Sequence, residues 1–283
     1  MSATARPVTA HLGTSHPDQH SEQHPRQPVA AGCECCSPAA WGQPWELGTA
    51  AFWVQQAAEF APGRGRHQLG RTLREEVAVC MLGGYGVPAA VGNAAFRVLR
   101  DAGLFADPLD EEVAAARMID ILAQPLTVGP DRAARYRFHQ QRPRRLAAAL
   151  TQLSKWENRV DDLSDVALRD SLMQLTGIGP KTASWIVRNH RDSDAVAIID
   201  IHIHRAGLTA GAFCANWTLQ RDYHRYEDAF LDWARSGFVS AADLDAAIWR
   251  LLAALGRHGR TFMERLDRTP STAEPVSETL FNL

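Results

Sequence analysis

The segment Leu175–Asn189, LTGIGPKTASWIVRN, constrains the fold of this 283-residue chain more than any other part of it. Gly177 and Gly179 permit positive φ and close backbone approach, and Pro180 suits the first turn of a helix because it has no N–H to leave unpaired. The preceding stretch has the apolar spacing of an amphipathic helix, with Val166, Leu168, Leu172 and Leu175. The sequence therefore predicts a helix, a tight hairpin and a second helix.

This hairpin has the properties of an anion site. Its backbone N–H groups have no partner within a regular element, and the positive end of the second helix dipole lies beside them. Both features suit a phosphate of a nucleic acid. Gly177, Gly179 and Thr182 are therefore candidate DNA-binding residues.

The rest of the chain after Trp45 also has helical periodicity. The strand-like run Ala195–Ile199 is short and stands alone, so we expect an all-α fold. Gly83, Gly84 and Gly86 follow a predicted helix rather than a strand, which favours a helix–helix turn over a phosphate-binding loop. We expect two helices built on Leu47, Ala51, Val54 and Ala58 and on Leu73, Val77, Cys80 and Met81, then one from Pro88 to Asp101 and others near 109–123, 144–156, 163–174, 180–190, 202–208, 219–235 and 241–256.

Composition limits the location of the protein. No run of about 20 apolar residues spans a bilayer, and the N-terminus lacks the apolar stretch of a signal peptide, so we expect a cytoplasmic protein with reduced cysteines. Residues 1–44 are rich in Pro, His, Gln, Ser and Thr, which predicts a disordered tail. Cys33, Cys35 and Cys36 in that tail fit no common zinc spacing, so we read them as incidental thiols, with metal binding as the alternative.

The charge is nearly balanced, with 30 basic and 32 acidic residues, so no overall field indicates a nucleic acid partner. Two local features do. Residues 132–188 hold eleven basic and five acidic residues. An arginine cluster there is a candidate phosphate-facing surface or a solvated face: Arg132, Arg135, Arg137, Arg142, Arg144 and Arg145. The chain also has just two lysines, Lys155 and Lys181, so a lysine invites a chemical explanation.

The hairpin is followed by AVAIIDIHIHR, Ala195–Arg205, and at this point the sequence resembles the helix-hairpin-helix DNA glycosylases. The resemblance covers roughly residues 70–265 and is sharpest at 175–205. It implies two helical subdomains with the active site in the cleft between them, formed by residues 45–80 with 195–268 and by residues 81–194, and a C-terminal tail at 269–283.

The resemblance assigns roles to three residues. Lys181 lies where the bifunctional members place their nucleophile; an arginine with a pKa above about 12 stays protonated and cannot attack carbon, and the helix N-terminus disfavours the ammonium form of a lysine. Asp200 would stabilise positive charge on the deoxyribose, and His202 would contact a DNA phosphate. The alternatives are a surface lysine, a helix N-cap, which is compatible with the chemical role, and a solvent-facing histidine.

The branch of the family follows from what is present and missing. Branches with an iron–sulfur cluster carry four clustered cysteines after the aspartate, whereas here Cys214 alone follows it. Monofunctional branches lack the hairpin lysine. The chain therefore resembles the compact microbial 8-oxoguanine glycosylase/lyases, in which a tryptophan-bearing C-terminal helix helps to enclose the base. Trp249 is the corresponding candidate for stacking on an extruded base, and packing in the core is the alternative.

The sequence thus predicts a monomeric, bacterial, nucleoid-associated DNA glycosylase and AP lyase that acts on double-stranded DNA and excises 8-oxoguanine through a Lys181 Schiff base, without metal or organic cofactor. Excision of another modified base, in genomic or foreign DNA, is the first alternative. A monofunctional glycosylase in which Asp200 activates water is the second. A non-catalytic DNA-binding protein that grips phosphates with the hairpin is the third.

Overall fold

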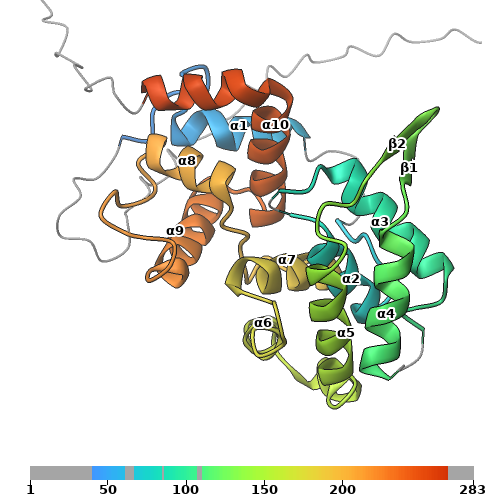
Figure 1. Ribbon diagram of the computed structural model, residues 1–283. Helices are drawn as coiled ribbons and strands as arrows, with labels where there is room; N and C mark the ends of the chain where they lie inside the picture. Colours follow the sequence, from blue (N-terminus) through green and yellow to red (C-terminus); the bar gives the residue numbers. More distant parts are fainter. Residues whose placement is uncertain (1–39, 61–66, 85, 107–109, 267–283) are drawn as a thin grey trace, which may run out of the picture.

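A computed structural model describes residues 40–60, 67–84, 86–106 and 110–266, and these form a largely helical protein in two parts (Figure 1). The predicted all-α fold class is confirmed. The elements are α1 (Ala50–Phe60), α2 (Leu73–Leu82), α3 (Ala89–Asp101), α4 (Glu111–Leu122), β1 (Leu126–Gly129), β2 (Arg132–Ala134), α5 (Gln141–Leu153), the 3-10 helix η1 (Glu157–Asp162), α6 (Asp165–Leu172), α7 (Pro180–Arg191), α8 (Ile201–Thr209), α9 (Tyr223–Ser236) and α10 (Ala241–Leu266).

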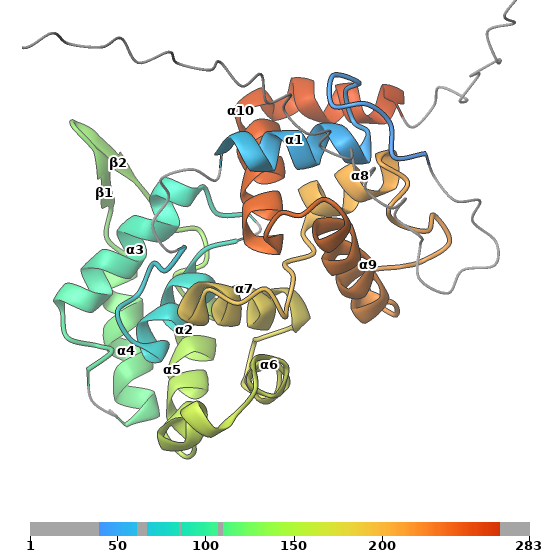
Figure 2. The ribbon, with the colours of Figure 1, turned by 180° about the vertical axis from the view of Figure 1, so that it is seen from behind.

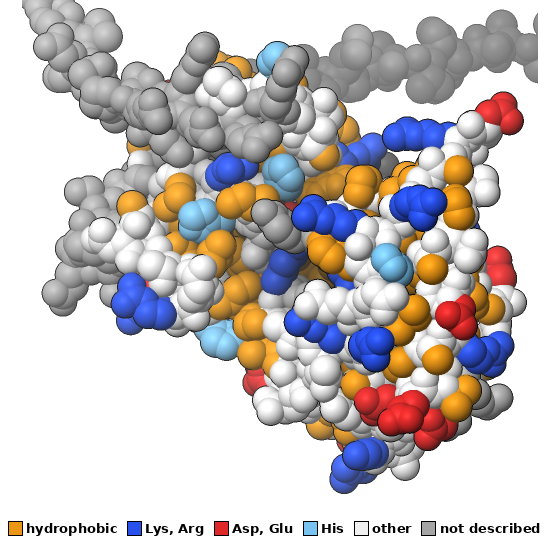
Figure 3. Space-filling model, in the orientation of Figure 1, with side chains coloured by type: hydrophobic (Ala, Val, Ile, Leu, Met, Phe, Trp, Pro, Cys, Tyr) orange, Lys and Arg blue, Asp and Glu red, His pale blue; other side chains and the backbone are white. Residues whose placement is uncertain are grey.

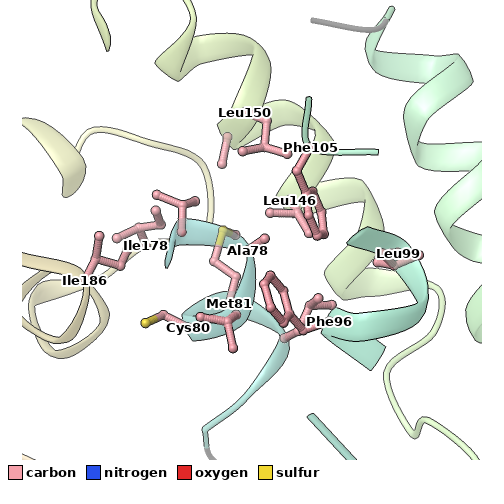
Figure 4. Close-up of a cluster of buried hydrophobic side chains, with 14 of the residues drawn as sticks. Ala78, Cys80, Met81, Phe96, Leu99, Phe105, Leu146, Leu150, Ile178 and Ile186 are labelled. Atoms are coloured by element: carbon pink, nitrogen blue, oxygen red, sulfur yellow. The ribbon is translucent and has the colours of Figure 1, made fainter. Parts of the chain in front are cut away.

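The first part is built on an aliphatic core. Helices α2 to α7 bury mostly Leu, Val, Ile and Ala side chains against one another (Figure 4). The sequence analysis grouped residues 73–80 with α1, but Leu73, Val77 and Cys80 of α2 lie in this core instead. The physical reason is that nearly every side chain of α2 is buried, because α2 lies between α3, α5 and α7.

The second part is built on an aromatic core from both ends of the described chain. Helix α1 packs along α10, and α8 and α9 complete the layer (Figures 1 and 2). The indole N–H of Trp233 in α9 donates to the carbonyl of Ala50 at 3.3 Å, which ties α9 to the start of α1. Its largest buried rings are Trp53, Tyr226, Phe230 and Trp233.

A short β-hairpin is the main feature that helical periodicity missed. Strands β1 and β2 pair antiparallel, with Leu126 opposite Ala134, and the hairpin projects away from the helices (Figures 1 and 2). Strands of four and three residues are too short to establish an alternating pattern. The turn signal was present, since Pro130 and Asp131 follow Gly129, and Asp131 adopts a positive φ of 52°.

The run Ala195–Ile199 is extended but pairs with no described strand. Side chains of α9 satisfy its backbone instead. The amide of Ala197 donates to Glu227 Oε1 at 3.0 Å, the amide of Ile199 donates to the Tyr223 hydroxyl at 3.2 Å, and that hydroxyl donates to the carbonyl of Ala197 at 3.0 Å. The segment is therefore a buried connection from α7 to α8, locked to the second part.

Other boundaries differ from expectation at the ends of the described chain. Helix α1 begins at Ala50 rather than near Trp45, and the Trp45 side chain is 79% exposed. Helix α10 continues to Leu266 through a kink at Gly256, where φ is 53°. No described helix is both long and apolar enough to cross a membrane. The cysteines at 33, 35 and 36, and the predicted tails apart from residues 40–44, lie outside the described residues.

Candidate active site

The hairpin between α6 and α7 has the predicted form, with one correction. Gly177 has φ +82°, and a Cβ there would lie 2.9 Å from Cδ of Arg145, so both conformation and space require glycine. Gly179 does not use positive φ; its φ is −101°, and a Cβ there would meet no atom within 4 Å. The fold therefore requires glycine at the first position, whereas the second glycine leaves open space in front of the hairpin.

Helix α5 holds the hairpin in place. The amide of Thr176 donates to Gln152 Oε1 at 2.9 Å, and Gln152 Nε2 donates to Thr176 Oγ1 at 2.8 Å. Within the described part of the chain, the amides of Gly177 and Gly179 have no acceptor. Thr182, in the first turn of α7, is half-buried. The hairpin thus presents free amide donors from a fixed backbone, as an anion site requires.

Lys181 occupies the second position of α7 and is half-buried. Its Nζ lies 5.8 Å from the ring centroid of Trp185, one turn along the helix. Trp185 in turn lies against the glycine turn after α2, since a Cβ built at Gly83 would be 3.4 Å from Cη2 of that ring. Gly84 adopts a positive φ of 83°, and the turn connects α2 to α3 as predicted. The glycine turn therefore borders the same face of α7 as the lysine.

One face of α7 joins the two parts of the protein. The residues three and seven positions after Lys181 lie on its face of the helix. Ser184 donates its hydroxyl to Glu227 Oε1 of α9 at 3.0 Å. Arg188 donates from Nη2 to Asp245 Oδ2 of α10 at 2.7 Å. Lys181 is therefore carried on the helix face that meets the second part.

Asp200 is the N-cap of α8. Its Oδ1 accepts hydrogen bonds from the amides of His202 at 2.7 Å and Ile203 at 2.9 Å. The side chain is half-buried at the end of the locked connection. The capping role named as an alternative is thus observed, and it uses one carboxylate oxygen.

The carboxyl of Asp245 lies within electrostatic reach of both candidate catalytic residues. Burial and the charge of Asp200 raise its pKa, the charges of Arg188 and Lys181 lower it, and the net result is a pKa of about 6. Lys181 and Asp200 come from helices in different parts of the protein. The charges of both residues therefore act on one buried carboxyl.

The two remaining sequence candidates are both accessible at least in part. His202 is half-buried in the first turn of α8. Trp249 is 43% exposed, so it does not pack in the core. Because Trp249 follows Asp245 by four residues, it lies one turn along the same face of α10.

The arginine cluster divides into two groups. Arg142 is structural: its guanidinium donates to the carbonyl oxygens of Met81 and Gly83 and stacks 4.7 Å from the Phe138 ring centroid. The other five are exposed, and Arg145 lies against the hairpin. In Figure 3, several Lys and Arg side chains lie around the junction of the two parts, and the largest group of acidic side chains on this face lies away from it, toward the lower right.

Sequence reasoning missed Trp185, Arg188 and Asp245. The helical spacing from Lys181 was available as a signal for the first two, since they follow it by four and seven residues. Nothing in the sequence marks Asp245 as the partner of Arg188. Among the described residues, no group of three His, Cys, Asp or Glu side chains is arranged to hold a metal, and Cys80 and Cys214 are buried and form no disulfide.

Comparison with known proteins agrees with this architecture. Residues 127–237 match the sequence model of a family described as 8-oxoguanine DNA glycosylase. No curated protein matches the chain. The 8-oxoguanine glycosylase/lyase of Methanocaldococcus jannaschii, solved with a 15mer DNA containing 8-oxoguanine, is 20% identical with a TM-score of 0.51, covering 72% of this chain and 89% of that one. A trapped covalent endonuclease III–DNA intermediate is 16% identical with a TM-score of 0.50, covering 75% and 96%.

At these identities the solved structures establish a common fold. The family match covers the segment that contains the hairpin, Lys181 and Asp200. The fold and this match support the resemblance to the helix-hairpin-helix DNA glycosylase superfamily that was found in the sequence.

Proposed function

We propose that this protein is a bifunctional DNA glycosylase and AP lyase that removes an oxidised base, 8-oxoguanine, from double-stranded DNA. The observation that carries the proposal is that Lys181 and Asp200 come from different parts of the protein, each at the N-terminal end of a helix, and that the charges of both act on the buried carboxyl of Asp245. The family match and the named activity of the Methanocaldococcus jannaschii relative support the choice of base.

The chemistry begins at the neutral amine of Lys181. Nζ attacks C1′ of the nucleotide, the bond from C1′ to the base breaks, and the base leaves with the electron pair and takes up a proton. The carboxylate of Asp200 stabilises the positive charge that develops on the deoxyribose. Ring opening gives an iminium between Nζ and C1′.

The lyase step uses this iminium as an electron sink. A proton is lost from C2′, a double bond forms between C2′ and C3′, and the C3′–O bond breaks to release the 3′ phosphate. Water then hydrolyses the Schiff base and frees Lys181. A guanidinium performs none of these steps because it stays protonated.

DNA binding is assigned to the hairpin and the basic surface beside it. The amides of Gly177 and Gly179 and the side chain of Thr182 face a phosphate, and the open space at Gly179 lets the DNA backbone approach closely. His202 contacts a second phosphate. The exposed arginines next to the hairpin supply charge without sequence preference.

The extruded base is assigned to the seam between the two parts. Trp249 offers an exposed indole ring on the same face of α10 as Asp245, and we propose that it stacks on the base. The two cores correspond in this proposal to two subdomains of a monomer, with the cleft between them.

Borohydride trapping tests this proposal. The full-length protein is incubated with duplexes containing 8-oxoguanine opposite cytosine, an abasic site opposite cytosine, or no lesion. Lys181→Gln and Lys181→Arg are compared with Lys155→Gln, which removes the other lysine of the chain. We expect covalent complexes on both modified duplexes with wild type and Lys155→Gln, and none with either Lys181 variant.

The outcomes separate the alternatives. Trapping on the abasic duplex without trapping on the 8-oxoguanine duplex would support the Schiff-base mechanism and show that the protein excises a different base. Base release without strand cleavage would indicate a monofunctional glycosylase. If neither wild type nor any variant reacts, and Lys181→Arg binds DNA as tightly as wild type, the result would favour a non-catalytic DNA-binding protein.

A further inference from the structure

A buried ion pair joins α7, the helix that carries Lys181, to α10. Arg188 and Asp245 are 8% and 7% exposed, and their nearest atoms are 2.7 Å apart. Removing both charges from water is costly, and well-packed apolar residues often replace such a pair without loss of stability. A buried pair at the seam between two cores therefore calls for a second explanation.

The position of the pair suggests one. Arg188 follows Lys181 by two helical turns on the same face of α7. The charged groups that act on the carboxyl of Asp245 are Arg188 and Lys181 of α7 and Asp200 before α8. On the α2 side, Glu76 and Cys80 also interact with the charge of Arg188. The pair is thus part of the charge environment of the lysine.

A second buried ion pair joins the same two parts and provides a contrast. Arg169 of α6 pairs with Glu227 of α9, and the carboxylate also accepts from Ser184 and from the amide of Ala197. Arg169 also donates from Nε to Asp170 at 2.6 Å, whereas Arg188 Nε is buried with no acceptor in the described part of the chain. The Arg169–Glu227 pair therefore has further hydrogen-bond partners on both side chains, as expected for a structural ion pair, whereas Arg188 leaves a buried Nε without one.

We propose that Arg188 and Asp245 are positioning residues for Lys181. Their ion pair holds α10 against α7, the helix that carries the nucleophile. The opposite charges of Arg188 and Asp245 also offset each other in their effect on the protonation of the Lys181 amine. Without Asp245, the unpaired guanidinium disfavours the ammonium form of Lys181. Without Arg188, the unpaired carboxylate favours it. This inference rests on the proposed function, because it concerns the protonation of the attacking amine.

The test measures the single-turnover rate of strand cleavage at an abasic-site duplex as a function of pH, with the full-length protein. Since the amine attacks only when neutral, the acidic limb of the profile reports its deprotonation. We expect this limb to move by about one pH unit to lower pH in Asp245→Asn and by about one pH unit to higher pH in Arg188→Met. The double variant Arg188→Met/Asp245→Asn should return it close to the wild-type position.

Glu227→Gln is the matched control, because it removes a buried carboxylate from the other ion pair. It should lower the unfolding temperature without moving the limb. Arg188→Lys keeps a buried cation, so the acidic limb of its pH profile should lie at the wild-type position. This variant still tests the inference if Arg188→Met does not fold. If the limb moves in the same direction in both single variants, or does not move in either, the inference is overturned. Cleavage by wild type would still support the proposed function in that case. No cleavage by wild type would overturn both.

Discussion

The two cores of this protein are built differently. The first is aliphatic and comes from one continuous stretch of chain, α2 to α7 with Val196. The second is aromatic and combines α1 with α8 to α10, which are far apart in sequence. The first core carries the hairpin and Lys181, and the second carries Asp200, Asp245 and Trp249. One half of the site therefore belongs to a core formed by a continuous stretch of chain. The other half belongs to a core that requires α1 to pack against α10, which is distant in sequence.

The largest expected effect tests the aromatic core. Trp233→Ala removes a fully buried ring and its hydrogen bond to Ala50, so we expect a loss of about 3–5 kcal/mol in the free energy of unfolding. Urea unfolding followed by circular dichroism measures it. Trp233→Phe keeps most of the ring and should lose less than half as much. A loss below about 1 kcal/mol in Trp233→Ala would mean that α1 does not depend on this contact.

The next effect separates chemistry from stability at the start of the second part. Asparagine caps helices as well as aspartate does, so Asp200→Asn should keep α8 while removing the charge. We expect base excision to slow by about 10²–10³-fold, or roughly 3–4 kcal/mol, with little change in stability. Asp200→Ala should also lose about 1 kcal/mol of stability. Single-turnover excision and urea unfolding distinguish the two, and an active Asp200→Asn would reduce this residue to a cap.

A smaller effect tests the two glycines of the hairpin. Gly177→Ala introduces a side chain at positive φ and displaces Arg145, so we expect it to destabilise the protein by about 1–2 kcal/mol. Gly179→Ala meets no protein atom, so stability should be unchanged while DNA affinity falls about tenfold, because the methyl group fills the space left for a phosphate. Fluorescence anisotropy with an undamaged duplex measures this affinity. Unchanged binding by Gly179→Ala would place the DNA elsewhere.

The sequence predicted most of what is local. The hairpin, the position of Lys181 in the first turn of α7 and the cap at Asp200 all follow from spacing and from the properties of Gly, Pro and Asp. The β-hairpin was missed because its strands are too short for a pattern to establish. Ala195–Ile199 has the composition of a strand, but its backbone amides donate hydrogen bonds to Glu227 and Tyr223 of α9 instead of to a neighbouring strand.

What the sequence could not supply is long-range pairing. Arg188 and Asp245 are 57 residues apart, and each alone has the sequence properties of an ordinary charged residue on a helix. The same holds for Arg169 and Glu227, which are 58 residues apart. Only the folded chain shows that both pairs join the two parts of the protein and that one of them includes a residue on the same face of α7 as Lys181.

The smallest expected effect contrasts two carboxylates by their response to pH. Burial raises the pKa of Asp165, but hydrogen bonds from Arg191 and Ser193 and the charge of Arg191 outweigh it, so the net pKa is lowered. The stability that Asp165 contributes is therefore present above its ordinary value of 3.8 and is lost as the pH falls through the lower folded value. Asp245 has the opposite sign, since its pKa is raised to about 6 and its ionisation costs stability as the pH rises through that value.

The matching variant is Asp165→Asn, which should lower the free energy of unfolding at neutral pH by at most about 1 kcal/mol, because the Arg191 pair is partly exposed. The difference from wild type should disappear in acid, below the folded pKa of Asp165. Urea unfolding from pH 2 to pH 7 measures it. A difference that persists at the acid end would show that Asp165 stabilises α6 through its shape and not its charge, and the contrast with Asp245 would then not be electrostatic.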